Sequence, residues 1–249
     1  MKFRTNNNQF ALVTLILYLV IWVWLAIDPL YRNDWLLENV LVFVSVPALL
    51  LMHRWLPLSR ISYGCIFLFL CLHAVGSHYT YAEVPYDNWF EAMTGWTLSD
   101  MIGMERNHFD RLVHFTWGFM LTYPIREVVI RVSQVRGFWA FLLPLLVVIS
   151  TSTIYEMIEW GASIVFGGEL GMAYLGTQGD IWDAHKDTSM AMLGSLIASI
   201  GIVAILASIN RDFAREWTDS LRIKHAEPLG EYEIERLLEE KNQLEADDK

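Results

Sequence analysis

Acidic and histidine side chains recur at helical spacing inside otherwise apolar stretches of this 249-residue sequence. Asp110 and His114 are four residues apart, and Glu156 and Glu159 are three apart, so each pair shares one face of a helix. A charged group at the centre of a membrane helix costs about 2.5–3.5 kcal/mol on insertion scales. Residues of this kind in apolar helices therefore favour a functional interpretation.

A third set of acids follows a glycine-rich turn. Asp180, Asp183 and Asp187 occupy the i, i+3 and i+7 positions of a single helical face. An acid at the start of a helix also caps it, so Asp180 has two interpretations, as a site residue or as a cap. His185 and Lys186 are offset from this face, and the lysine side chain is expected to extend toward the membrane surface.

The residue types indicate acid–base or metal chemistry. Imidazole and carboxylates without thiolates suit a divalent ion such as Zn²⁺, Mn²⁺ or Mg²⁺. The predicted roles are metal ligation by Asp110, His114 and Asp187, and acid–base catalysis by Glu156, Glu159 and Asp183.

Charge counting supports the same chemistry. Six carboxylates face two fixed cations, Arg111 and Lys186, which leaves a surplus of up to four negative charges. Protonated carboxyls, charged histidines or a bound metal would compensate it. A network that served packing alone should come nearer to balance.

Membrane-spanning helices must position these side chains. Hydrophobic residues make up 54% of the chain and charged residues 18%, against about 25% charged in ordinary soluble proteins. A span needs about 20 mostly apolar residues. Six stretches qualify, at 10–27, 36–52, 61–82, 108–125, 138–166 and 181–209. The sequence thus predicts an all-α, polytopic membrane helical bundle of about six transmembrane helices.

Basic residues predict the orientation of these spans, because they concentrate on the cytoplasmic side. With the N-terminus inside, nine basic residues flank the inner ends, against two to four at the outer ends. The inner set is Lys2, Arg4, Arg54, Arg60, Arg126, Arg131, Arg136, Arg211 and Arg215. Both termini are therefore expected in the cytoplasm, with segments 83–107 and 167–179 outside.

This orientation places the ionisable groups at one depth. His114 and Asp187 each lie six residues into their predicted spans, or roughly 9 Å from the outer end at 1.5 Å per residue. A polar cluster is therefore expected in the outer half of the bilayer. Glu38 is expected at the membrane interface, and His73, which lies deeper, as a packing residue.

Small residues on the last span predict close helix packing. Gly194, Ser195 and Gly201 give that span small faces, and Gly118 lies below Asp110 and His114 on the fourth span.

The chain divides into two predicted domains. Residues 1–209 form the six-helix transmembrane domain, and residues 210–249 form an acidic cytoplasmic tail, partly helical, with 7 basic and 12 acidic side chains. The overall net charge of −10 argues against nucleic acid as a partner. The expected partners are the lipid bilayer and a lipid-linked or amphipathic ligand on the periplasmic side. The sequence indicates no oligomeric state.

Three motifs carry a resemblance to a known family. They are Asp110-Arg-Leu-Val-His114-Phe with Gly118, Tyr155-Glu156-Met-Ile-Glu159, and Leu175-Gly-Thr-Gln-Gly-Asp180-Ile-Trp-Asp183-Ala-His-Lys-Asp187. Over residues 10–210 the sequence resembles the YjdF-type bacterial inner-membrane proteins, a domain of unknown function, and more faintly the VanZ-like membrane proteins. The resemblance implies a multi-pass protein of the bacterial inner membrane and the position of the site, but no activity.

Three functional hypotheses follow from the residues. The first is a metal-assisted or acid–base hydrolase or transferase acting on lipid or envelope substrates at the outer leaflet. The second is an ion- or proton-coupled transporter, or a protein that binds a lipid or amphiphile. The third is a purely structural polar network. The absence of an evident internal repeat weighs against a carrier.

Overall fold

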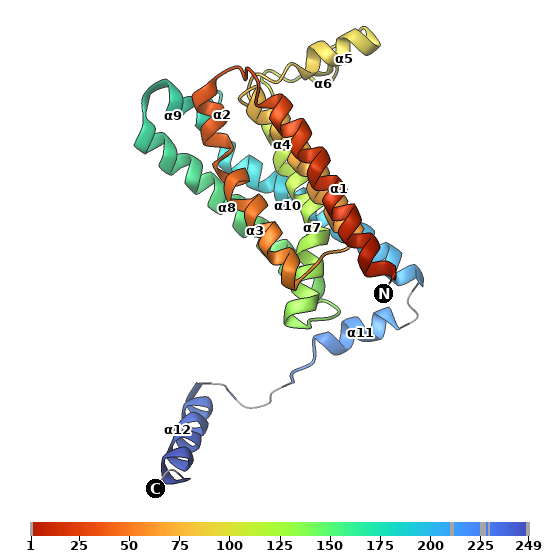
Figure 1. The fold of residues 1–249 in the computed structure, drawn as a ribbon, viewed down its shortest axis with the longest axis vertical. Coiled ribbons are helices and arrows are strands. Elements are labelled where there is room, and N and C mark those ends of the chain that lie inside the picture. The colour runs from red at the N-terminus through yellow and green to blue at the C-terminus, as the bar shows by residue number, and fades with distance from the viewer. Residues whose placement is uncertain (1, 210–211, 225–227, 229, 248–249) are drawn as a thin grey trace.

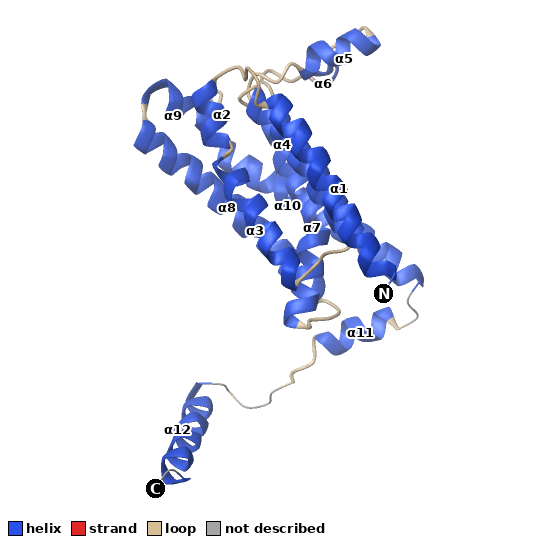
Figure 2. Ribbon diagram, in the orientation of Figure 1, coloured by secondary structure: helices blue, strands red, loops and turns tan. Residues whose placement is uncertain are grey.

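The computed structural model is all-helical and describes residues 2–209, 212–224, 228 and 230–247 (Figures 1 and 2). No β-strand occurs within these ranges. The helices in chain order are α1 (Lys2–Leu25), α2 (Arg32–Glu38), α3 (Val40–Trp55), α4 (Arg60–His78), α5 (Tyr86–Thr94), α6 (Leu98–Ile102), α7 (Phe109–Ser133), α8 (Trp139–Phe166), α9 (Gly168–Leu175), α10 (Asp183–Ile209), α11 (Phe213–Ser220) and α12 (Gly230–Asp247).

Five segments of the described chain are long and apolar enough to cross a membrane. They are Asn7–Leu25, Arg32–Trp55, Arg60–His78, Trp139–Phe166 and Asp183–Ile209, and each overlaps one of the predicted spans. The remaining prediction, 108–125, falls in α7, a helix of 25 residues whose mean hydropathy is lowered by the charged residues at its two ends. The chain is a multi-pass helical membrane protein.

The long helices pack as a bundle around α7, which contacts α4, α8 and α10, while α1 lies against α4 (Figure 1). The outer faces of the long helices carry large exposed apolar side chains, such as Val20, Trp24 and Ile200. In water such a surface would be unfavourable, but it matches the hydrocarbon interior of a bilayer. The buried polar residues are therefore inside the bundle, where other helices supply their partners.

The second predicted span is broken at Asn39, the residue between α2 and α3. The Asn39 side chain is fully buried; its Oδ1 accepts a hydrogen bond from Trp22 Nε1 at 2.6 Å, and its Nδ2 donates to the carbonyl of Trp35 at 2.8 Å. The break separates the short helix α2 from α3. This separation matters because α2 carries the acidic residue Glu38.

Two glycines allow α7 and α10 to touch along their backbones. A Cβ atom at Gly118 would lie 1.8 Å from the carbonyl oxygen of Ala191, and one at Gly194 would lie 2.1 Å from that of Phe115. One turn further along, the hydroxyls of Thr122 and Ser195 hydrogen-bond at 2.6 Å. The two helices thus run parallel, with their first turns at the same end of the bundle. The predicted close packing of the last span is confirmed at Gly194, where Gly118 of α7 provides the facing gap, whereas a Cβ at Gly201 would meet nothing within 4 Å.

Two further segments lie apart from the bundle core. Helices α5 and α6 pack against each other and project from one end (Figure 1). At the other end, α11 docks on the start of α8, where the backbone N–H of Phe138 donates to the Ser220 hydroxyl and Trp217 contacts Phe141. The predicted domain boundary after residue 209 falls on Asn210 and Arg211, which lie outside the described residues.

Candidate functional site

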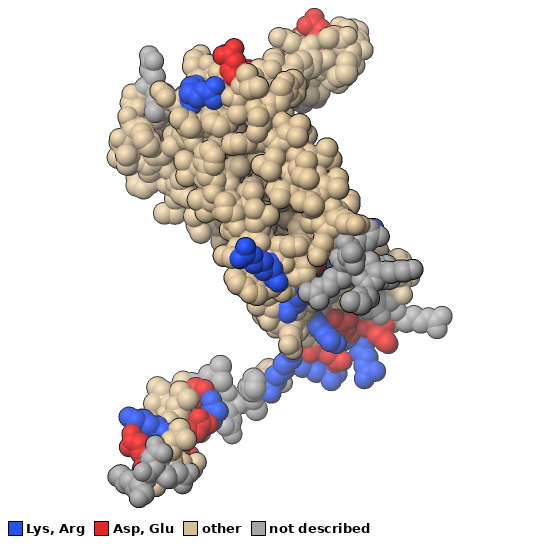
Figure 3. Space-filling model, viewed as in Figure 1, with Lys and Arg blue, Asp and Glu red and all other residues tan. Residues whose placement is uncertain are grey.

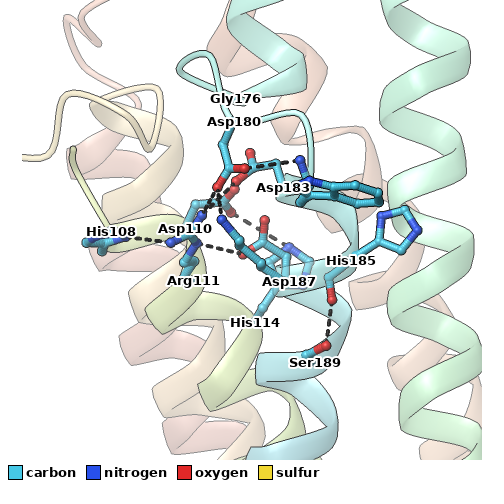
Figure 4. Close-up of polar contacts among 12 residues, drawn as sticks. His108, Asp110, Arg111, His114, Gly176, Asp180, Asp183, His185, Asp187 and Ser189 are labelled. Carbon is cyan, nitrogen blue, oxygen red and sulfur yellow. Dashed lines mark hydrogen bonds and ion pairs between the residues drawn. The ribbon is translucent and has the colours of Figure 1, made fainter. Parts of the chain in front are cut away.

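The sequence-predicted site residues gather at the end of the bundle where α7 and α10 begin (Figure 4). Asp110 and His114 extend from the first two turns of α7, and Asp183 and Asp187 from the first two turns of α10. Helical spacing places each pair on one face, and the parallel arrangement of the two helices turns the faces toward each other. We call Asp110, His114, Glu156, Glu159, Asp180, Asp183 and Asp187 the polar cluster.

Three carboxylates of the polar cluster converge on one point. Asp110, Asp183 and Asp187 each offer one oxygen, and these oxygens all lie within 4.8 Å of one another. Asp183 and Asp187 are buried, and Asp187 Oδ1 has no hydrogen-bond partner within the described chain. A buried carboxylate oxygen without a donor carries an uncompensated desolvation cost. The arrangement has the oxygen donors and the unmet need for positive charge that a divalent cation would satisfy.

Two arginines lie beside these acids. Arg106 Nη1 lies 2.7 Å from Asp183 Oδ1. Arg111 Nη2 lies 2.5 Å from Asp180 Oδ2 and 3.4 Å from Asp183 Oδ1, and its Nε lies 3.9 Å from Asp187 Oδ1. The participation of Arg106 was missed by sequence reasoning, which treated it only as a basic residue of an outer loop.

Asp180 lies in the turn just before α10, where its side chain contacts both the backbone and Lys186. Its Oδ1 accepts a hydrogen bond from the backbone N–H of Trp182 at 3.0 Å, just before α10 begins. Its Oδ2 is 2.6 Å from Lys186 Nζ, which the sequence placed outside the acidic face. The hydrogen bond from Lys186, with those from Trp182 and Arg111, holds the pKa of Asp180 well below its usual value. Asp180 is therefore the firmly ionised member of the polar cluster.

His114 lies between α7 and α8 rather than among the three converging aspartates. Its Nδ1 is 3.2 Å from the hydroxyl of Ser152, and its Nε2 is 3.3 Å from Glu156 Oε1 and 3.7 Å from Asp110 Oδ1. The imidazole is buried. It is thus placed to exchange a proton with either neighbouring carboxyl group.

Glu159 lies near Tyr155, in a group of acids and tyrosines that includes Glu38. Tyr155 donates a hydrogen bond to Glu38 Oε2 at 3.4 Å. The Glu159 carboxyl lies close enough to the Tyr155 hydroxyl to accept a hydrogen bond from it. Glu38 was expected at the membrane interface; its side chain is instead buried within the protein, at the end of α2 beside the break at Asn39. The spacing of Asp34 and Glu38, four residues apart, was the signal that could have shown a buried acidic face.

Adding these residues leaves the charge argument unchanged. With Glu38 and Arg106 counted, seven carboxylates face three fixed cations. A surplus of up to four negative charges therefore persists, as the sequence predicted.

The two remaining histidines considered in the sequence lie apart from the aspartates. His185 points away from them and contacts the ring of Trp182, with ring centroids 5.4 Å apart (Figure 4). His73 is buried and its Nδ1 hydrogen-bonds to the hydroxyl of Tyr81, while its Nε2 has no hydrogen-bond partner within the described chain.

The fold and the polar cluster define a multi-pass helical membrane protein whose buried carboxylates and histidine meet at one end of the bundle. Residues 10–208 match the family described as "Predicted membrane protein (DUF2238)", and the chain belongs to that family. It is 37% identical over 196 residues to "Inner membrane protein YjdF" of Escherichia coli (strain K12), covering 78% of this chain and 87% of that protein. No solved structure matches the chain. The relative places this protein in the bacterial inner membrane.

Proposed function

We propose that this protein is a divalent-metal-dependent hydrolase or transferase that acts on lipid or lipid-linked substrates at the outer leaflet of the inner membrane. The observation that carries the proposal is the convergence of Asp110, Asp183 and Asp187, together with the buried Oδ1 of Asp187, which accepts no hydrogen bond within the described chain. Three carboxylates around one point repel one another unless a proton or a cation intervenes.

The donor set favours one class of metal. All three converging ligand atoms are carboxylate oxygens, which suit hard ions such as Mg²⁺ or Mn²⁺ better than Zn²⁺. In this arrangement Asp183 takes the ligand position that the sequence assigned to His114. His114 then becomes free for proton transfer with Glu156.

The bound metal would polarise the substrate and lower the pKa of a coordinated water. The chain itself supplies the remaining functions. Glu156 and His114, 3.3 Å apart, receive and pass on a proton. Arg106 and Arg111 hold the Asp183 carboxylate in place and present guanidinium groups to an anionic substrate. Glu159, next to Tyr155 and Glu38, supports Glu156 from the buried side.

The proposal includes a topology of six spans with both termini in the cytoplasm. In support, α7 has 25 residues and packs at the centre of the bundle between helices that are themselves long enough to span. On the visible face, Lys and Arg side chains gather at the end that carries the N-terminus and α11 (Figure 3). The positive-inside rule then assigns that end to the cytoplasm and the polar cluster to the outer side.

Manganese binding tests the metal site directly. We expect the full-length protein in nanodiscs to bind one Mn²⁺ and Asp187→Asn to weaken the affinity by about 100-fold, because the substitution removes a charged ligand. A titration in which electron paramagnetic resonance detects free Mn²⁺ measures both the number of ions bound and the affinity. Asp34→Asn is the matched control, since Asp34 is also buried and accepts a hydrogen bond from the hydroxyl of Thr80 but is not one of the three converging aspartates, and it should leave the affinity unchanged.

The two alternative functions, a structural network and a transporter, predict different results in these experiments. Absence of Mn²⁺ and Mg²⁺ binding by the wild type would refute the proposed metal site. If Asp110→Asn and Asp187→Asn then change only thermal stability, the polar cluster is a structural network. Ion or proton flux into liposomes that depends on Glu156 would instead support a transporter.

A further inference from the structure

A cavity of about 310 Å³ lies between α3, α4, α7 and α8. Its walls are mostly apolar, with side chains such as Val42, Phe69 and Trp117, and its polar lining includes Asp110 and His114 of the polar cluster. Small-molecule sites commonly have this size and this combination of apolar walls with a few convergent polar groups. The cavity thus joins the proposed site to the interior of the bundle.

The mouth of the cavity faces the bilayer. Val44 of α3 and Ile154 and Ile158 of α8 line the cavity and are also exposed on the outer surface of the bundle. Within the described chain, α3 and α8 do not pack closely along one another. A ligand therefore reaches the cavity sideways, from the hydrocarbon layer, through the gap between these two helices.

The inner wall is sealed from the bilayer. Val113, on α7 between Asp110 and His114, lines the cavity and is only 6% exposed. Lipids that merely surround the protein cannot touch this side chain. A chain that entered between α3 and α8 would touch it, and would bring its head end against the carboxylates.

We infer that this cavity binds one hydrocarbon chain of a membrane lipid, which enters laterally between α3 and α8 and presents its polar head to the polar cluster. This inference rests on the proposed function: if the polar cluster is the catalytic site, the bound lipid is its substrate, and the substrate class is a lipid drawn from the bilayer. The favourable free energy comes from van der Waals contact with the walls, because a chain drawn from the bilayer exchanges one apolar environment for another. The polar head of the lipid would contact Asp110 and His114, the polar-cluster residues that line the cavity.

A photoreactive lipid tests the inference. The full-length protein is reconstituted in nanodiscs of phosphatidylethanolamine and phosphatidylglycerol that contain a phosphatidylglycerol with a diazirine in one acyl chain. We expect mass spectrometry after illumination to find label on Val113 as well as on lipid-facing side chains. Ile154→Trp should fill the mouth and lower labelling of Val113 about tenfold, the effect of about 1.4 kcal/mol of overpacking.

The matched control is Ile164→Trp on the same helix, because Ile164 is 64% exposed but does not line the cavity, whereas Ile154 is 55% exposed and does. Ile164→Trp should leave Val113 labelling unchanged. Labelling confined to lipid-facing residues, or equal loss in both variants, would overturn the inference. Labelling of Val113 that persists in Asp187→Asn and in chelator supports chain binding even where Mn²⁺ binding fails, so the two proposals are tested separately.

Discussion

Arg111→Gln is expected to lower the free energy of unfolding by about 3 kcal/mol, whereas Lys186→Gln should cost less than about 1 kcal/mol. Both cations contact the same atom, Asp180 Oδ2, at 2.5 Å from Arg111 and 2.6 Å from Lys186. They differ in burial, because the Arg111 side chain is 18% exposed and that of Lys186 is 49% exposed. The two variants therefore compare a mostly buried cation that contacts several acids with a half-exposed cation on the same carboxylate.

The large cost at Arg111 arises from what its removal leaves behind. Its Nη2 is 3.4 Å from Asp183 Oδ1 and its Nε is 3.9 Å from Asp187 Oδ1, and both aspartates are buried. Asp183 retains Arg106, but Asp187 loses its nearest arginine. A buried charge without a partner is destabilising by several kcal/mol, whereas an exposed pair is screened by solvent.

Reversible unfolding by sodium dodecyl sulfate in mixed micelles measures the difference between the two variants. Equal losses for Arg111→Gln and Lys186→Gln would show that burial does not govern these pairs. If the aspartates bind a metal, saturating Mn²⁺ should restore part of the stability of Arg111→Gln, since a ligand that binds only the folded state stabilises it.

Local helical spacing made much of the polar cluster predictable. Asp110 with His114, and Asp183 with Asp187, are four residues apart, so membership of a helix alone places each pair on one face. Their equal depth followed from the expected span boundaries, and the structure brings the first turns of α7 and α10 together. The close contact at Gly194 was also predictable, since small residues permit close approach of membrane helices.

Helical spacing alone did not place the two missed residues, Arg106 and Glu38. Arg106 lies in the loop before α7, and its contact with Asp183 depends on how that loop folds over α10. Glu38 is the last residue of α2, beside the break at Asn39, and Asn39 accepts a hydrogen bond from Trp22 on α1. Interactions between segments distant in sequence determine both positions, so the local pattern contained only weak signals for them.

Gly118→Ala and Gly194→Ala are expected to weaken both the fold and the proposed metal site. In either variant the new Cβ would meet a backbone carbonyl oxygen of the partner helix, at 1.8 Å from Ala191 or 2.1 Å from Phe115. An ordinary contact lies near 3.5 Å, so α7 and α10 would have to separate by roughly 1 Å or more. Backbone atoms cannot rotate away, and we expect a loss of about 3 kcal/mol in the free energy of unfolding.

Separating the two helices should also move the converging carboxylates apart, because Asp110 belongs to α7 and Asp187 to α10. Moving one helix by about 1 Å spoils a coordination geometry that tolerates only a few tenths of an ångström, so Mn²⁺ affinity should fall at least about tenfold. Gly201→Ala is the control on α10: its Cβ would meet nothing within 4 Å, so it should be neutral or gain up to about 1 kcal/mol from helix propensity. A stabilised Gly118→Ala that binds Mn²⁺ normally would show that the backbone contact between α7 and α10 does not set the spacing of the site.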